Sequence, residues 1–255
     1  MPVLRRIPIL IALLFAIDIA LAIFPLVDFW AGSPFNRLRN VFNLDREHTI
    51  PTWYSSMQWF CAAALFALFA AYAYRSRLRG WLPVAAIALM CLAFSVDEIT
   101  AIHEFLGMIS DRLFQGGTRQ GTALWNTGMW PLVIGIPVLI VVAVLVHGTR
   151  QAFAASASGA LWKLIAGLAI MFTGALVIEL GANLISVVPD SRGLVLGQVV
   201  LEEFLEMLGV TFIVWSGYEL LAGYGFELTV PAVASFSPNP RPAPSASASA
   251  RSAYS

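Results

Sequence analysis

The sequence predicts an all-α protein, a polytopic transmembrane helical bundle of about six spans followed by a disordered C-terminal tail. Hydrophobic residues make up 59% of the chain and charged residues only 12%, whereas a soluble domain carries roughly 25% charged residues. Several apolar runs approach about 20 residues, the length at which an α-helix crosses a hydrocarbon core. A span in that core must satisfy its backbone polar groups internally, so the spans are helices.

Six apolar segments are predicted to cross the bilayer. Loops containing glycine, arginine and small polar residues separate them, and Pro51 and Pro131 suit the first turns of the second and fourth segments. The predicted spans cover residues 7–29, 51–74, 81–105, 130–147, 161–185 and 194–222. Together they form one transmembrane bundle over residues 1–230.

The chain ends in a segment of different composition. Residues 231–255 are rich in serine, proline and alanine and lack a periodic apolar face, so we expect a disordered tail. The whole chain has a net charge of zero and no basic face, so we expect the lipid bilayer as a partner and no nucleic acid.

The first span has an alternative interpretation as a cleaved signal peptide. The letters LRR, the apolar stretch behind them and the small residues ALA at 20–22 fit that pattern loosely. Asp18 interrupts the apolar stretch and favours a permanent span.

The cationic residues predict the orientation. An even number of spans places both termini on one side, and the short link RSRLRG between the second and third spans is typical of a cytoplasmic loop. We therefore expect a multi-pass protein of the bacterial inner membrane with both termini in the cytoplasm. The other side carries six cationic residues, and the nine on the cytoplasmic side are Arg5, Arg6, Arg75, Arg77, Arg79, Arg150, Lys163, Arg241 and Arg251.

Acidic residues gather at the end of the bundle that this orientation turns toward the periplasm. Asp97 lies about 24 Å along the third span, and Glu179 about 27 Å along the fifth. Glu202, Glu203 and Glu206 lie about 12 to 18 Å below the outer start of the sixth. Ionisable groups inside a membrane are costly and usually face a partner or a cavity. The asymmetry therefore predicts a site.

Helical phase, at about 100° per residue, divides the third span. Asp97 and Glu104 differ by only about 20°, so they are expected to act together with His103 beside them. Glu98 points more than about 100° away from His103 and Glu104, so it is expected to serve another partner.

The fifth span is predicted to use two faces. Gly167, Gly174 and Gly181 recur every seven residues, and such a stripe of small residues lets a neighbouring helix approach closely. Glu179 lies on roughly the opposite face at α-helical phase.

The residue types predict a divalent metal site. Glu202 and Glu206 share a face of the sixth span, and carboxylates with a histidine on facing helices suit iron or manganese better than zinc. The Glu-x-x-His step of soluble di-iron bundles does not occur in the sequence, so the metal is not identified. Glu98 and Glu203 are the predicted catalytic residues, for proton transfer. The predicted metal ligands are Asp97, His103, Glu104, Glu179, Glu202 and Glu206.

A simpler interpretation remains open for the acids at the end of the third span. Asp97, Glu104 and Asp111 can form a hydrated helix end that pairs with Arg112 or Arg119.

Two segments, DREHTIPTWYSS and SVDEITAIHE, resemble a family of uncharacterised multi-pass bacterial membrane proteins. The resemblance covers about the first half of the chain and carries no activity with it. The matching residues are Glu47, Pro51, Thr52, Trp53, Ser55, Asp97, Glu98, His103 and Glu104.

Three functions are compatible with this sequence. The leading hypothesis is a metal-dependent membrane enzyme that activates oxygen or water against a lipid-soluble substrate, although the residues do not decide that the protein is an enzyme. The second is a cation- or proton-coupled transporter, which requires a polar path below Glu206. The third is an accessory subunit of a membrane complex.

Overall fold

The structure, a computed structural model, describes residues 7–34, 36–46, 48–115, 122–125, 127–154, 156, 159–185 and 192–226. In these ranges every regular element is a helix, as the sequence predicts. The predicted tail, 231–255, lies outside the described residues, as does Glu47.

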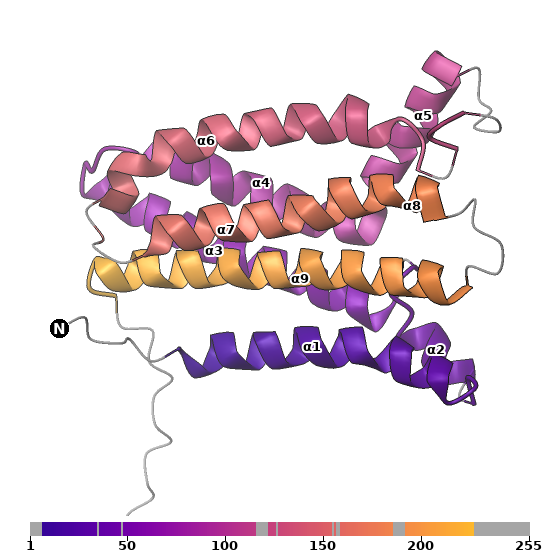
Figure 1. The fold of residues 1–255 in the computed structure, drawn as a ribbon. Coiled ribbons are helices and arrows are strands. Elements are labelled where there is room, and N and C mark those ends of the chain that lie inside the picture. The colour runs from indigo at the N-terminus through magenta and orange to yellow at the C-terminus, as the bar shows by residue number, and fades with distance from the viewer. Residues whose placement is uncertain are drawn as a thin grey trace, which may run out of the picture.

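The described residues form six helical rods, which make up the bundle (Figure 1). Two of them are composite, because short π-helical segments, η1 and η2, are continuous with α-helices. The rods are α1 (Ile9–Trp30), α3 (Ile50–Arg75), α4 (Trp81–Thr100), η1 (Pro131–Gly135) with α6 (Ile136–Ala154), α7 (Ala160–Phe172) with η2 (Thr173–Ile178) and α8 (Glu179–Ile185), and α9 (Arg192–Gly223). The remaining short helices are α2 (Asn36–Val41) and α5 (Ile102–Gln115).

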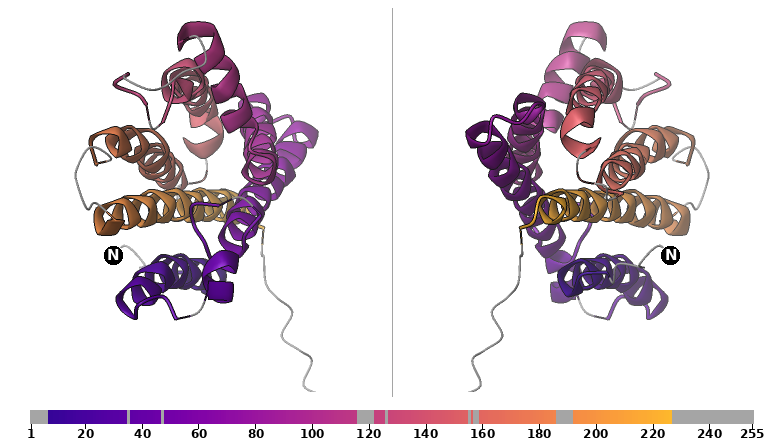
Figure 2. Two further views of the ribbon diagram at one scale, coloured as in Figure 1. Left: turned by 90° about the vertical axis from the view of Figure 1, so that its right-hand side faces the viewer. Right: turned by 90° about the vertical axis from the view of Figure 1, so that its left-hand side faces the viewer.

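The rods run back and forth between two ends of the bundle. α1 begins and α9 ends at one end, while α2, α5 and α8 lie at the other, which is called the site end below (Figure 1). α9 packs against α1, α3 and α7, and the views along the bundle show it between α1 and the α7 rod (Figure 2). α9 is therefore the central helix of the fold.

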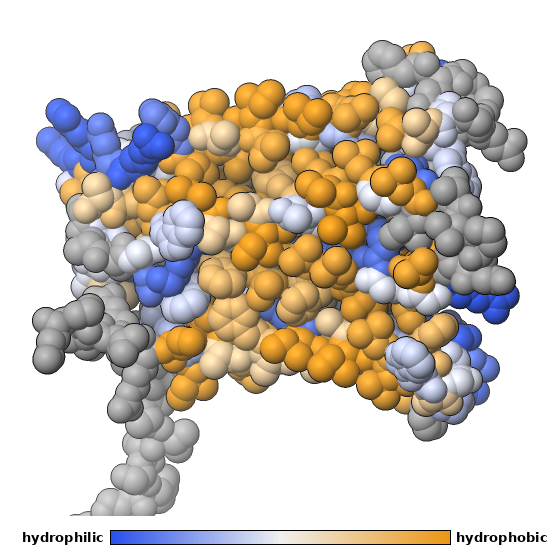
Figure 3. All heavy atoms as spheres, in the orientation of Figure 1, coloured by the Kyte–Doolittle hydropathy of each residue, from blue (hydrophilic) through white to orange (hydrophobic). Residues whose placement is uncertain are grey.

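The surface is that of a membrane protein. Figure 3 shows a broad apolar belt with polar groups at both ends of the bundle. Five rods in the described ranges are long and apolar enough to cross a bilayer: α1, α3, α4, η1 with α6, and α7 with its continuation to Leu184. These are five of the six predicted spans. The sixth, α9, has the length of a span, 32 residues, but carries several glutamates and is not among the five.

The third predicted span, 81–105, ends earlier than the sequence suggests. α4 stops at Thr100, and Ala101 has φ 49° and ψ 42°, the left-handed conformation that an alanine rarely adopts. A new helix, α5, starts at Ile102. Helical phase cannot be counted across this break, so it no longer supports a common face for Asp97 and Glu104.

Glycines permit a close crossing of α7 and α9. A Cβ added to Gly209 lies 2.6 Å from the carbonyl oxygen of Gly167, and one added to Gly167 lies 2.6 Å from that of Gly209. Gly174 is restricted as well, since an added Cβ lies 2.8 Å from the carbonyl oxygen of Glu202. The predicted stripe is thus confirmed for Gly167 and Gly174. A Cβ at Gly181, in contrast, meets no atom within 4 Å.

We predict that Gly209→Ala destabilises the detergent-solubilised protein, because backbone atoms on α7 cannot move aside for the new methyl group. Overpacking of this kind costs about 1–3 kcal/mol. Gly197→Ala is the matched control on the same helix, since its Cβ meets nothing within 4 Å and alanine favours a helix over glycine by about 1 kcal/mol. Thermal unfolding measures both. Equal melting temperatures for the two variants would contradict the close crossing.

Candidate functional site

The site is built on α9, where three glutamates lie within five residues. Glu202 is ten residues from the start of the helix, about 15 Å along it. Glu202 and Glu206 share a face because they are four residues apart, and Gln198, one turn earlier, donates a hydrogen bond to the Glu202 carboxylate. The predicted face of α9 is therefore present. Glu202, Glu203 and Glu206 are all partly buried.

A π-helical segment brings Glu179 to this face. Between Gly174 and Glu179 the rod is wound as η2, and an i→i+5 turn holds one residue more than an α-turn. Relative to a regular α-helix, that extra residue rotates the following side chains by about 100° around the helix axis. Gly174 and Glu179 therefore both meet α9, and the Glu179 carboxyl is hydrogen-bonded to that of Glu202. The prediction that Glu179 lies opposite the glycine stripe is wrong for this reason.

Glu98 approaches the same group from α4. It accepts a hydrogen bond of 3.0 Å from the Ser55 hydroxyl on α3, a partner that sequence reasoning did not identify. Its charge also acts on Glu206 and on His103. Glu98 thus borders the glutamates of α9 instead of facing away from the site. We call this group the acidic cluster, and its members are Glu98, Glu179, Glu202, Glu203 and Glu206.

Asp97 and His103 form a pair at the break between α4 and α5. One carboxylate oxygen of Asp97 accepts from the His103 backbone N–H at 2.9 Å, and the other lies 2.8 Å from Nδ1 of the ring. Trp130 covers the imidazole, with ring centroids 5.3 Å apart. Asp97 is therefore committed to capping the first turn of α5. Its partner is His103 and not Glu104.

The charge of His103 depends on this pair. Burial of the ring acts to lower the pKa of His103, but the hydrogen bond and charge of Asp97, with the charges of Glu104 and Glu98, outweigh it. The pKa therefore lies above its usual value.

Asp45 is a residue of the site that the sequence interpretation missed. It is in the loop before α3, where its backbone N–H donates to the Asn43 side chain at 2.8 Å. Partial desolvation raises the pKa of Asp45, Arg46 opposes this, and the nearby Glu104 adds to it. Asp45 also acts electrostatically on Glu202. We call Asp45 and the exposed Glu104 the rim of the acidic cluster, because Glu104 acts electrostatically on Asp45 and Asp45 acts on Glu202. The ionisable residues Glu47 and His48, which follow it closely in the sequence, were the signal that could have pointed to Asp45.

No preformed metal centre is present in the described part of the chain. Its ranges contain no group of three or more His, Cys, Asp or Glu residues arranged to hold a metal ion. Even so, the strongest charges acting on Glu202 and Glu206 are all carboxylates, from α4, α8, α9 and the Asp45 loop. The acidic cluster therefore needs protons or a cation to offset its charge.

A second buried carboxylate lies deeper in the bundle. Asp18 of α1 is 0% exposed and accepts three hydrogen bonds: from the Tyr54 hydroxyl at 2.7 Å, from the Gln58 amide at 3.0 Å and from the Thr211 hydroxyl at 2.7 Å. Thr211 is five residues from Glu206, about 7.5 Å along α9. Asp18 ties α1 to α3 and α9, which supports α1 as an integral span. Polar groups thus continue below Glu206.

Other acids have protein partners. Glu219, near the far end of α9, pairs with Lys163 of α7 at 2.9 Å, and the Lys163 ammonium lies 4.6 Å from the centroid of Trp215. Asp111 is only 4% exposed, and its carboxylate accepts from the backbone N–H of Met129 at 2.9 Å. The hydrated position predicted for Asp111 is therefore wrong.

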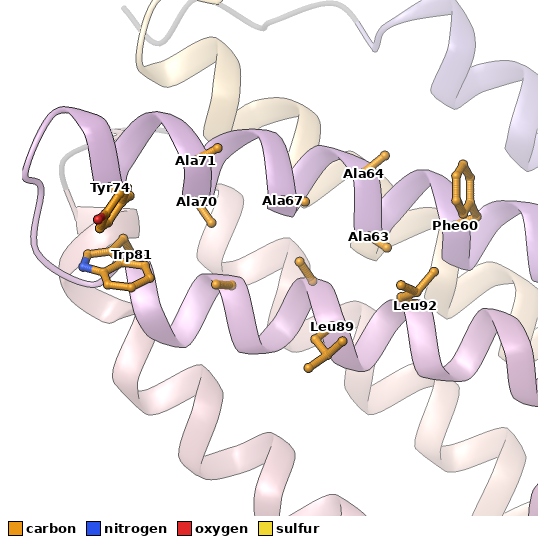
Figure 4. Close-up of a pocket in the computed structure, with 12 residues that line it drawn as sticks. Phe60, Ala63, Ala64, Ala67, Ala70, Ala71, Tyr74, Trp81, Leu89 and Leu92 are labelled. Carbon is orange, nitrogen blue, oxygen red and sulfur yellow. The ribbon is translucent and has the colours of Figure 1, made fainter.

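An apolar groove of about 540 Å³ lies between α3 and α4. Alanines line much of it, and Tyr74 and Trp81 close one end with their rings 5.0 Å apart (Figure 4). Among the described residues that line it there is no carboxylate, histidine, lysine or cysteine.

We predict that protonation of His103 stabilises the protein. A raised pKa in the folded state gives stability that is fully present below the unfolded-state value of about 6.5 and is lost as the pH rises through the folded-state pKa. Melting temperatures across this range should therefore fall more steeply with pH in the wild type than in His103→Gln. The exposed His147 provides the control variant His147→Gln, which should follow the wild type. If melting temperature falls with pH equally in the wild type and in His103→Gln, protonation of His103 does not stabilise the fold through Asp97.

Comparison with known proteins identifies the family. No curated protein and no solved structure matches the chain. Residues 7–220, which include the acidic cluster and the Asp18 network, match a family described as a domain of unknown function (DUF8692). The chain is therefore a member of the DUF8692 family.

Proposed function

We propose that the acidic cluster binds a divalent metal ion, and that the protein is a metal-dependent membrane enzyme acting on a lipid-soluble substrate. The contact between the Glu179 and Glu202 carboxyls carries this proposal. Two carboxyl groups can form a hydrogen bond only if they share a proton. A divalent cation held by these carboxyls would replace that proton and would offset the charge of the neighbouring glutamates.

The donor set favours particular metals. Carboxylate oxygens from separate helices suit manganese or iron, whereas structural zinc sites draw mainly on cysteine and histidine. Glu179, Glu202 and Glu206 are the proposed ligands. Small side-chain movements have to bring them into coordination, since the described residues hold no ready-made group of three. A metal bound here would supply an activated water or oxygen species to the substrate.

The remaining predicted residues take supporting roles in this proposal. Glu98 and Glu203 exchange protons between the cluster and its surroundings. Asp97 and His103 bond to each other, so they are not among the proposed ligands, and Glu104 stands with Asp45 at the rim. We further propose that the site end faces the periplasm of a bacterial cell and that both termini are cytoplasmic, because the arginines between α3 and α4 lie at the opposite end.

We predict that the purified full-length protein contains about one manganese or iron ion per chain, and that Glu202→Gln and Glu206→Gln weaken its binding by at least about tenfold. Elemental analysis and a Mn²⁺ titration after chelation measure this, and bound Mn²⁺ should raise the melting temperature of the wild type. Glu219→Gln is the matched control on α9, since its amide oxygen still accepts from Lys163. Wild-type protein that contains no metal and is not stabilised by Mn²⁺ or Fe²⁺ rules the proposal out.

A second candidate function, a proton-coupled transporter, is favoured by the Asp18 network. Asp18 lies below the acidic cluster with hydroxyl and amide donors around it. It thus provides the deeper polar step that a transport path requires.

We predict for this second function that wild-type protein in liposomes dissipates a pH gradient and that Asp18→Asn abolishes the flux. The asparagine keeps the size of the side chain, and the Thr211 hydroxyl can rotate to accept from its amide. Gly197→Ala should retain full flux. An internal pH-sensitive dye measures the rate. A flux that persists in Asp18→Asn excludes Asp18 from the path, and a wild type without flux excludes the transporter.

A further inference from the structure

A cavity of about 590 Å³ opens beside the acidic cluster at the site end. It lies between the last turns of α1, the loop that follows α2 and the first turns of α9. Cavities of this size hold small organic ligands. Its lining divides into an apolar wall and a polar rim, the pattern of a site for an amphiphile.

The apolar wall comes from the two helices that face each other. Phe24 and Phe29 of α1 stand on one side, and Val195, Leu196 and Val199 of α9 on the other. α1 is one of the five described rods that are long and apolar enough to cross a bilayer, and this wall is apolar like the rest of that helix. It suits an acyl chain.

Asp28 is the clearest sign of a missing ligand. It lines the cavity and is only 6% exposed, and its Oδ1 has no hydrogen-bond partner among the described residues. Asp28 is also two residues from the end of α1, where the helix dipole disfavours a negative charge. A buried carboxylate in this position requires a hydrogen-bond donor, and a cationic donor most of all.

Two arginines line the same cavity. Arg39 of α2 is held by a hydrogen bond of 3.0 Å from Nη2 to the Asn36 side chain. Arg192 is the first residue of α9, a helix of 32 residues whose N-terminus adds partial positive charge. Guanidinium groups beside a helix start favour a phosphate.

We propose that this cavity binds a phospholipid whose headgroup carries both a phosphate and a primary ammonium, as phosphoethanolamine does. Arg39 and Arg192 bind the phosphate, Asp28 accepts from the ammonium, and an acyl chain lies on the wall between α1 and α9. The zwitterion matches the two arginines and the two carboxylates, Asp28 and Asp45, that line the cavity. A choline headgroup leaves Asp28 without a donor because its nitrogen carries no hydrogen, and a glycerol headgroup brings no positive charge.

The lipid site is independent of the proposed metal chemistry. Asp45 belongs to both the cavity and the rim of the acidic cluster, so the test leaves Asp45 unchanged. Binding needs neither a metal nor turnover. Its failure would therefore leave the proposed function untouched.

The test is a calorimetric titration of the detergent-purified full chain with short-chain dihexanoyl phospholipids. We expect phosphatidylethanolamine to bind at least about tenfold more tightly than phosphatidylcholine or phosphatidylglycerol, the difference that one charged hydrogen bond gives. Asp28→Asn should remove this preference, and Arg192→Gln should weaken all three lipids. Arg37→Gln, an exposed arginine of α2 outside the cavity, is the control and should bind as the wild type does.

Several outcomes would overturn the proposal. Equal affinity for the three lipids would contradict the proposed bond between Asp28 and the ammonium. An unchanged preference for phosphatidylethanolamine in Asp28→Asn would contradict it as well. If free phosphoethanolamine binds as tightly as the lipid, the acyl chain does not contribute to binding. The site would then be one for a soluble phosphate ester. If Asp28→Asn does not fold, Arg192→Gln decides, and unchanged binding in that variant overturns the phosphate contact.

Discussion

The cost of placing a carboxylate inside an apolar bundle governs this structure. Along α9 that cost is met in three ways. Near one end, Glu219 is paired with the ammonium of Lys163. In the middle, Asp18 receives hydrogen bonds from two hydroxyls and an amide. At the site end, the strongest charges acting on Glu202 and Glu206 are those of other carboxylates, an arrangement that is unfavourable unless protons or a cation join them. The proposed metal site concerns this third level.

Close packing and irregular winding together create that level. The crossing of Gly167 and Gly209 brings the backbones of α7 and α9 together, and Gly174 continues the contact to the level of Glu202. The π-helical turn of η2 then rotates Glu179 toward the same face of α9. π-helical turns cost hydrogen-bond geometry and occur often at functional sites. A regular α-helix in this position would turn Glu179 away from α9.

Length and apolarity were enough to predict five of the six spans, and the four-residue spacing was enough to place Glu202 and Glu206 on one face. Other features depend on information that periodicity does not contain. The break at Ala101 and the π-helical turn each change the helical register, so phases counted through them failed for Glu104 and Glu179. The network of Asp18 joins residues 36 to 193 positions apart in the chain, and the loop residue Asp45 meets α9 only in the folded bundle.

The polarity of α9 also bears on how the protein enters the membrane. An aspartate or similar charge at the centre of an isolated span opposes insertion by roughly 2.5–3.5 kcal/mol, and α9 carries four glutamates. Its polar partners lie on helices that precede it in the chain. Lys163 on α7 pairs with Glu219, Asp18 on α1 accepts from Thr211, and Gln58 on α3 donates to the backbone carbonyl of Met207. Because synthesis proceeds from the N-terminus, those helices are already made when α9 emerges. The order of the helices thus lets the least apolar rod insert against a finished protein surface instead of against lipid.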